Sequence, residues 1–224
     1  MMFNDNNFRA IQDKIEYARK NSPLSSDKVT VLAACKGQGG EAIRAAIAAG
    51  IRDFGENRVQ EAQAKWPALR REFPSVRLHL IGPLQTNKVK QALELFDVIQ
   101  TIDRPKLAEA VAKTLADHRI IGSSDHRFYI QVNIGKEPQK AGVMPEEADS
   151  LIAECRKLGL PVEGLMCIPP DAQPPGPYFA LLREIGLRNG LSGLSMGMSG
   201  DYETAVRMGA GCVRLGRILF SGGL

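Results

Sequence analysis

Lys36 is the residue whose position most clearly indicates chemistry. It follows the apolar run 30–35, which predicts a buried strand, and it precedes the glycine-rich segment 37–40. A lysine at the carboxyl end of a buried strand has its ammonium directed at a cleft, and desolvation there favours the neutral amine, which condenses with carbonyl groups. Taken alone, a strand-end lysine whose tip reaches solvent is the commoner explanation.

Two loops near the end of the chain have the composition of a phosphate site. Ser199 and Gly200 come just before a helix expected to start near Asp201, and Gly216 and Arg217 begin a short final helix. Backbone N–H groups at helix amino termini bind anions through their unpaired hydrogens and the helix dipole. Each loop alone is equally well explained as a plain helix cap or a tight turn. Together with a carbonyl-reactive lysine, the loops predict a phosphorylated carbonyl compound as the ligand.

The elements that must position these residues follow one repeated order, in which a short apolar strand is followed by a polar loop and an amphipathic helix. An opening helix is expected over 8–21. The eight expected strands are 29–35, 52–54, 77–81, 98–102, 128–134, 162–168, 191–196 and 212–215, and the helices between them are 40–49, 57–73, 86–96, 105–118, 145–158, 178–186 and 201–208. This alternation predicts an α/β fold, a closed (β/α)8 TIM barrel with an extra amino-terminal helix.

A doubly wound sheet is the main alternative architecture. It often carries a glycine-rich dinucleotide-binding turn. The segment 36–40 lacks the GxGxxG spacing, and no P-loop GxxxxGK[ST] occurs in the sequence. In a barrel the chemistry lies at the carboxyl ends of the strands, which is where Lys36 and both glycine-containing loops fall. The barrel is therefore the favoured prediction.

Composition and charge narrow the class of protein. The 224 residues can bury a full core as one domain, 1–224, and a composition of 44% hydrophobic and 24% charged residues is ordinary for a globular protein. The net charge of +4 is spread over amphipathic segments, which suits an anionic small ligand better than nucleic acid. The sequence has no apolar window of membrane-spanning length, and segment 1–7 lacks the apolar stretch of a signal peptide. We therefore expect a cytoplasmic protein that does not enter a membrane.

Cysteine and histidine positions argue against a metal site. The four cysteines form no CxxC pair, and the histidines have no ligand spacing with them; these residues are Cys35, Cys155, Cys167, Cys212, His79, His118 and His126. Cys35, Cys167 and Cys212 lie in apolar runs and are expected to be reduced core residues. The segment 122–125 is expected to form a turn.

Six short motifs in the sequence, taken in order, resemble those of a known protein family. They are Ala34-Cys35-Lys36, FGENRVQE at 54–61, HLIGPLQTNK at 79–88, Gly164-Leu165-Met166, SMGMS at 195–199 and VRLG at 213–216. In this order they closely resemble the pyridoxal phosphate homeostasis protein family, over about residues 29–220. The resemblance implies one barrel of fold type III, like the amino-terminal domain of alanine racemase, holding pyridoxal 5′-phosphate (PLP).

The resemblance also implies roles for particular residues. Lys36 would hold the cofactor aldehyde as a Schiff base, the internal aldimine, and Arg214 would face the pyridine nitrogen. The other implied contacts are Ser199, Gly200 and Gly216 at the phosphate with Arg217 beside them, Asn57 and Met198 near the ring or phosphate, and His79 and Lys88 at the rim of the mouth. Two departures leave the phosphate contacts open: the family often has threonine or serine where Arg217 stands, and its ending is longer and more charged than 220–224.

The arginine at the pyridine nitrogen bears on whether the chain is an enzyme. PLP catalysis depends on a protonated pyridine nitrogen as electron sink, and a neighbouring arginine keeps that nitrogen unprotonated. Racemases of this fold add a second base, a tyrosine contributed by another domain across a dimer interface. No tyrosine of this sequence is indicated as the second base by its position; the four tyrosines are Tyr17, Tyr129, Tyr178 and Tyr202.

The function expected from the resemblance is therefore intracellular PLP (vitamin B6) homeostasis without a robust catalytic cycle. The chain would store, buffer or deliver PLP as a monomer or weak dimer, with PLP-dependent apo-enzymes as candidate recipients. The alternatives left open are a weak PLP-dependent amino-acid racemase and a Schiff-base aldolase. An aldolase needs a second acid or base near Lys36, and Asp103, Lys88 and Lys140 are the candidates.

Overall fold

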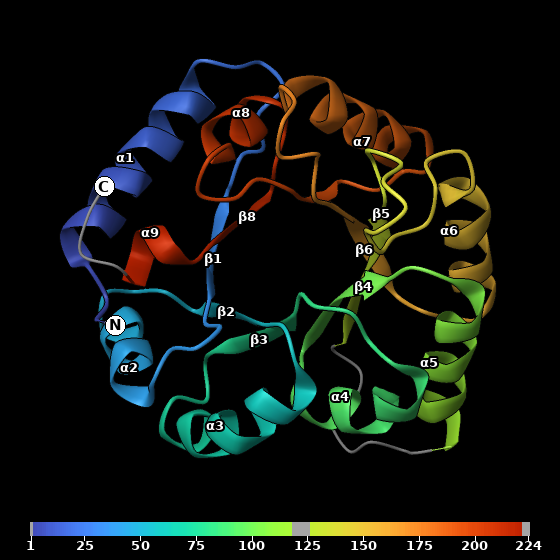
Figure 1. Ribbon diagram of the computed structural model, residues 1–224, viewed down its shortest axis with the longest axis horizontal. Helices are drawn as coiled ribbons and strands as arrows, with labels where there is room; N and C mark the ends of the chain where they lie inside the picture. The colour runs from blue at the N-terminus through green and yellow to red at the C-terminus, as the bar shows by residue number, and fades with distance from the viewer. Residues whose placement is uncertain (1, 118–125, 221–224) are drawn as a thin grey trace.

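Eight parallel strands close into a barrel, and the helices surround it as a ring (Figure 1). The structure is a computed structural model and describes residues 2–117 and 126–220. His118 and the turn expected at 122–125 lie outside these residues. The strands follow each other around the barrel in sequence order, and β8 pairs with β1. The predicted (β/α)8 barrel is confirmed, and closure excludes a doubly wound sheet.

The strands and helices occur in the predicted order. The strands are β1 (Thr30–Ala34), β2 (Asp53–Glu56), β3 (Arg77–Leu80), β4 (Val98–Ile102), β5 (Arg127–Val132), β6 (Val162–Cys167), β7 (Gly193–Ser195) and β8 (Cys212–Leu215). The helices are α1 (Asp5–Lys20), α2 (Gly40–Ala48), α3 (Val59–Glu72), η1 (Thr86–Lys88), α4 (Val89–Leu95), α5 (Pro105–Asp117), α6 (Ala148–Lys157), α7 (Gly176–Arg188), α8 (Tyr202–Arg207) and α9 (Arg217–Phe220). The single helix expected over 86–96 instead begins as the 3-10 turn η1, in which the Lys88 N–H donates to the Gln85 carbonyl at 2.9 Å.

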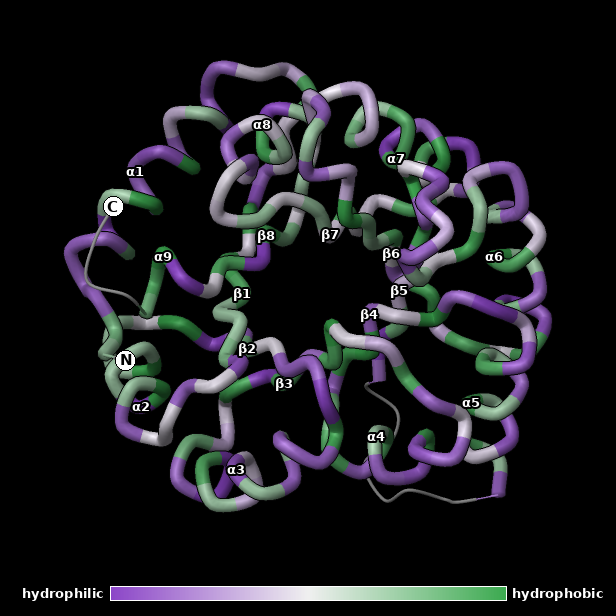
Figure 2. The backbone as a smooth tube through the Cα atoms, viewed as in Figure 1, coloured by the Kyte–Doolittle hydropathy of each residue, from purple (hydrophilic) through white to green (hydrophobic). Residues whose placement is uncertain are grey.

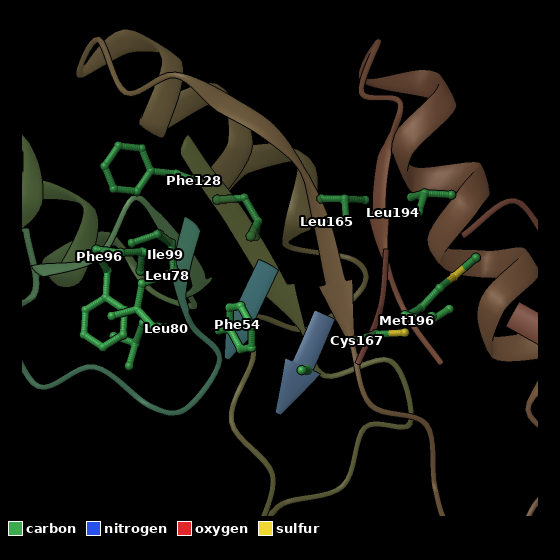
Figure 3. Packing of buried hydrophobic residues seen from close by; sticks show 14 of the residues in the cluster. Phe54, Leu78, Leu80, Phe96, Ile99, Phe128, Leu165, Cys167, Leu194 and Met196 are labelled. Carbon is green, nitrogen blue, oxygen red and sulfur yellow. The ribbon is translucent and has the colours of Figure 1, made fainter. Parts of the chain in front are cut away.

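The main hydrophobic core lies between the strands and the helices. Side chains alternate along a strand, so the residues on one face of each strand reach the helices. Phe54, Leu80 and Ile99 belong to this layer (Figure 3), and the Phe54 ring lies 5.2 Å from that of Trp66 on α3. Figure 2 shows hydrophobic residues alternating with hydrophilic ones along the helices, as expected for helices with one buried face.

The inside of the barrel is unusually polar. Asp53, His79, Gln100, Ser195 and Arg214 are all buried, although the layers inside a TIM barrel are dominated by branched apolar side chains. Each of them is adjacent in the chain to an apolar residue of the outer core. The alternation along the strands therefore turns these polar side chains towards the barrel axis, away from the helices.

The amino-terminal helix α1 packs outside the ring against α8 and α9 (Figure 1). The backbone N–H of Asn4 donates to the Leu219 carbonyl at 2.8 Å, and the Asn7 side chain donates to the Ile218 carbonyl at 3.1 Å. The first helix thus holds the last one, which directly follows β8. The extra amino-terminal helix predicted from the sequence is confirmed.

All four cysteines are buried and free, which confirms the prediction for Cys35, Cys167 and Cys212. Within residues 2–117 and 126–220, no group of histidine, cysteine or carboxylate side chains is placed to hold a metal ion. In the same described ranges, no helix is long and apolar enough to cross a membrane.

An alanine at Gly164 tests how closely β6 approaches β7. A Cβ at this position would lie 1.9 Å from the carbonyl oxygen of Gly193, so the strands would have to separate. We expect Gly164→Ala to lower the free energy of unfolding by about 1–3 kcal/mol in urea denaturation. Gly40→Ala is the control because its Cβ would meet only the flexible end of Arg44. Equal losses in both variants would contradict the close approach of the strands.

Candidate functional site

Lys36 lies in a turn just beyond β1, at the carboxyl end of the barrel. Its side chain lines a cleft of about 680 Å³, whose other polar walls include Asn57, Gln85 and Lys88. Lys36 is exposed, so the desolvation predicted for its ammonium is wrong for this structure. The cleft itself is as predicted, and an amine in an open cleft is accessible to a carbonyl compound from solution.

Lys65 of α3 holds the backbone on both sides of Lys36. The Lys65 ammonium donates to the carbonyl oxygens of Cys35 at 3.3 Å and Gln38 at 3.2 Å. It also forms an ion pair of 2.6 Å with the fully buried carboxylate of Glu56. These contacts fix the turn that carries Lys36 while leaving its side chain unrestrained. This anchor was not predicted from the sequence, although a glutamate at the end of an apolar strand was a usable signal.

The loop after β7 turns sharply at a glycine. Gly197 has a φ of +93°, and a Cβ there would lie 2.5 Å from the Cβ of Ala205, so only glycine fits. The turn directs Ser199 and Gly200 towards the start of α8. No hydrogen bond between described residues uses the backbone N–H of Ser199, Gly200 or Gly216 as donor. These amides have no acceptor among the described residues, so the anion contact expected for them stays a prediction.

The loop after β8 lies beside the strand that leads to Lys36. In the β1–β8 register, Leu32 is opposite Arg214 and Ala33 is opposite Leu215. A Cβ built on Gly216 would lie 3.5 Å from the carbonyl oxygen of Ala34. The start of the last loop therefore lies beside the end of β1, two residues before Lys36.

Arg214 is a buried cation near the carboxyl end of β8. Its guanidinium donates to the Ser195 hydroxyl at 2.8 Å and to the Cys167 carbonyl at 2.7 Å. Burial lowers the pKa of Arg214, yet a guanidinium remains charged at neutral pH. Among the described residues, no carboxylate forms an ion pair with it. A buried cation with only neutral acceptors favours a ligand that offers an electron pair or a negative charge.

His79 is not at the rim of the mouth, so that prediction is wrong. Its side chain is 6% exposed and lies inside the barrel, 3.0 Å from both the Asp53 carboxylate and the Gln100 amide. The strand alternation turns it towards the barrel axis, because Leu78 and Leu80 on either side of it belong to the outer core. Lys88, the other residue expected at the rim, does line the cleft.

Met198 and Arg217 have limited roles in the observed geometry. The Met198 N–H donates to the Asp201 carboxylate at 2.6 Å, so this amide is already used within the loop. Arg217 begins α9 and is exposed. Of the residues predicted for the phosphate, Ser199, Gly200 and Gly216 thus offer the available backbone donors.

The residues considered for a second acid or base are engaged in other contacts. Asp103 pairs with Arg104, and burial raises the pKa of Asp103 against the opposing effect of this arginine. Lys140 donates to the Pro169 carbonyl at 3.0 Å and pairs with Glu137 at 2.5 Å. Of the three candidates Asp103, Lys88 and Lys140, only Lys88 lines the cleft of Lys36.

None of the four tyrosines lines the cleft around Lys36. Tyr17 on α1 and Tyr178 on α7 are exposed. Tyr129 and Tyr202 are partly or fully buried, and burial raises the pKa of both phenols, that of Tyr202 to about 12. A neutral phenol with a raised pKa is a poor general base at neutral pH.

A second cleft lies at the opposite end of the barrel. It has a volume of about 590 Å³ and is lined by α1 and the amino-terminal ends of the strands, including Asp53 and Arg77. These two side chains form an ion pair of 2.8 Å. Because barrel chemistry belongs to the carboxyl ends of the strands, we place the functional site in the cleft of Lys36.

The fold and the rim residues define a barrel of the alanine racemase type, and residues 7–222 match the alanine racemase N-terminal domain. The "Pyridoxal phosphate homeostasis protein" of Pseudomonas aeruginosa is 38% identical over 96% of this chain and 93% of its own. The protein of the same name from Aquifex aeolicus is 36% identical over 94% of each chain. The chain belongs to the pyridoxal phosphate homeostasis protein family.

A solved relative extends the comparison to three dimensions. The structure of PipY from Synechococcus elongatus with PLP bound has a TM-score of 0.77 at 34% identity and covers 94% of this chain and 100% of its own. The resemblance found in the sequence motifs is therefore confirmed at the level of family and fold.

Replacing Lys65 tests the anchor behind Lys36. Lys65→Met leaves the buried Glu56 carboxylate without its ion-pair partner, so we expect the free energy of unfolding to fall by about 3 kcal/mol in urea denaturation. Arg44→Met is the control because it breaks an ion pair with Glu72 in which both side chains are exposed, and it should cost less than about 1 kcal/mol. The double variant Lys65→Met/Glu56→Gln should recover part of the loss; no recovery would refute the pairing.

Proposed function

We propose that this chain holds PLP on Lys36 and serves in PLP homeostasis without a robust catalytic cycle. The observation that carries the proposal is an exposed lysine in an open cleft at the end of β1, the strand that pairs with β8 and ends beside Gly216. The relatives named pyridoxal phosphate homeostasis proteins and the PLP-bound PipY structure support it.

The residues at the rim fit the three recognisable parts of PLP. The accessible amine of Lys36 suits the aldehyde, and the available amides of Ser199, Gly200 and Gly216 suit the phosphate. The buried Arg214 cation, which has no carboxylate partner among the described residues, suits the pyridine nitrogen as an acceptor. When bound, PLP supplies an aldehyde that bonds covalently to amines and a ring that withdraws electrons.

The residues proposed to surround PLP offer little support for a catalytic cycle. Arg214 at the pyridine nitrogen disfavours the protonated ring on which electron withdrawal depends. The cleft offers no tyrosine as a second base, and Asp103 and Lys140 are held in contacts of their own. These contacts weigh against the racemase and aldolase alternatives.

An open cleft with an unrestrained lysine suits loading and unloading of a cofactor. Covalent attachment to Lys36 would keep the aldehyde from reacting with other amines, while solvent access would allow another amine to displace it. We therefore propose storage and delivery to PLP-dependent apo-enzymes in the cytoplasm, by a chain that acts as a monomer or weak dimer.

Borohydride trapping tests the attachment residue. We expect purified protein incubated with PLP to show a visible absorption band and, after reduction, a stable phosphopyridoxyl group on the peptide that contains Lys36. Lys36→Ala should lose both signals because the amine is gone. Lys90→Ala, an exposed lysine on α4 that does not line the cleft, should keep both. A protein that takes up no PLP, or a label found on another residue, would overturn the proposal.

Comparison of PLP with pyridoxal, which lacks the phosphate, tests the anion site. Two hydrogen bonds to a charged group contribute about 3 kcal/mol or more, so pyridoxal should bind about a hundredfold more weakly in fluorescence titrations. Inorganic phosphate should compete with PLP at millimolar concentration. Equal affinities for PLP and pyridoxal would show that the β7 and β8 loops do not bind the phosphate.

A further inference from the structure

A row of hydrogen-bonded side chains crosses the inside of the barrel. The Arg214 guanidinium lies 2.8 Å from the Ser195 hydroxyl, which lies 2.6 Å from the Gln100 carbonyl oxygen. The Gln100 amide nitrogen lies 3.0 Å from Nδ1 of His79, and Nε2 of His79 lies 3.0 Å from the Asp53 carboxylate. The five residues come from β8, β7, β4, β3 and β2, and each is at most 6% exposed.

All four hydrogen bonds of this row run in one direction. Arg214 can only donate, so the Ser195 oxygen accepts and its proton goes to Gln100. Gln100 then donates its N–H to Nδ1 of His79, which must be unprotonated. The proton of His79 is therefore on Nε2 and is donated to Asp53. Each group has one orientation that satisfies its neighbours, and the carboxylate ends the row.

The carboxylate end of the row is held ionised. Burial acts to raise the pKa of Asp53, but hydrogen bonds from His79 and Arg77 hold that pKa below its ordinary value. Arg77 pairs with Asp53 at 2.8 Å from the side of the second cleft. A carboxylate that can only accept fixes the His79 tautomer, and through it the orientation of Gln100 and Ser195.

We propose that Asp53, His79, Gln100 and Ser195 are positioning residues that fix the Arg214 guanidinium towards the cofactor ring. This inference rests on the proposed function, because it assumes that PLP binds above Arg214. The row holds the guanidinium through Nη1, and the Cys167 carbonyl holds it through Nη2. The Nε–H group donates in no hydrogen bond between described residues, so it is available to a ligand.

Packing alone does not account for the row. Filling a barrel interior with apolar side chains is often as stable as burying charges and amides, which lose their hydration. Leu32 and Met166 show that this barrel also accepts apolar residues inside, since both are fully buried and lie outside the core between strands and helices. An apolar interior was therefore open to this barrel, and the continuous polar row calls for a role besides packing.

The test breaks the row at a distance from the cofactor. Ser195→Ala removes the acceptor of Arg214, and Gln100→Met removes the next link. We expect both variants to shift the absorption maximum of bound PLP and to weaken its binding about tenfold, the loss expected for one hydrogen bond to a charged group. Ile99→Val is the control: it precedes Gln100 on the same strand but belongs to the core between strands and helices, so it removes buried volume on the other face of the strand and should leave both readouts unchanged.

A second readout uses the protein without PLP. Nitrogen-15 NMR of the histidine side chains should show His79 protonated only at Nε2. Gln100→Glu removes the N–H that faces Nδ1 and supplies an acceptor, so His79 should become protonated at both nitrogens. A structural role through packing predicts no such change, because glutamate and glutamine have nearly the same shape.

The outcomes separate this inference from the proposed function. If the unmodified protein takes up no PLP, the proposed function fails and the inference fails with it. If it binds PLP but Ser195→Ala and Gln100→Met behave like Ile99→Val, the inference alone is overturned. A His79 ring protonated at Nδ1 in the unmodified protein would also overturn it, because the hydrogen bonds would then not share one direction.

Discussion

The pairing of β8 with β1 is the contact on which the rest of the structure depends. It closes the barrel, and its register sets Arg214 opposite Leu32, four residues before Lys36. Residues from the two ends of the sequence become neighbours through this pairing. The strand before Lys36 and the strand that carries Arg214 and leads to Gly216 thus end side by side because the sheet has no edges.

The interior of this barrel contains buried polar side chains, whose desolvation costs free energy, in place of the apolar side chains usual in such barrels. A buried carboxylate and a buried guanidinium lie at opposite ends of one row of hydrogen bonds, and neutral groups between them complete it. Because each member satisfies the next, the row limits the desolvation cost of its uncharged members. The same arrangement leaves Arg214 without a carboxylate, which makes its environment suited to a ligand.

The sequence was sufficient to predict the elements, the barrel and the positions of Lys36, Ser199 and Gly216 just after β1, β7 and β8. These features depend on local patterns, such as the apolar run before Lys36 and the glycines after β7 and β8. The environment of His79 depends on barrel geometry, because strand stagger decides which inward side chains meet. The Lys65–Glu56 pair was missed for a similar reason, since it joins α3 to the end of β2. A glutamine within the apolar strand β4 was the visible sign of the polar interior.

Closure between the first and last strands also orders events during translation. The strand that leads to Lys36 leaves the ribosome early, whereas β8, Arg214 and Gly216 are among the last residues made. Until β8 arrives, β1 presents an unpaired edge and Lys36 has no loop from the last strand beside it. The surroundings of Lys36 are therefore completed only when the last strand made joins the first, late in folding.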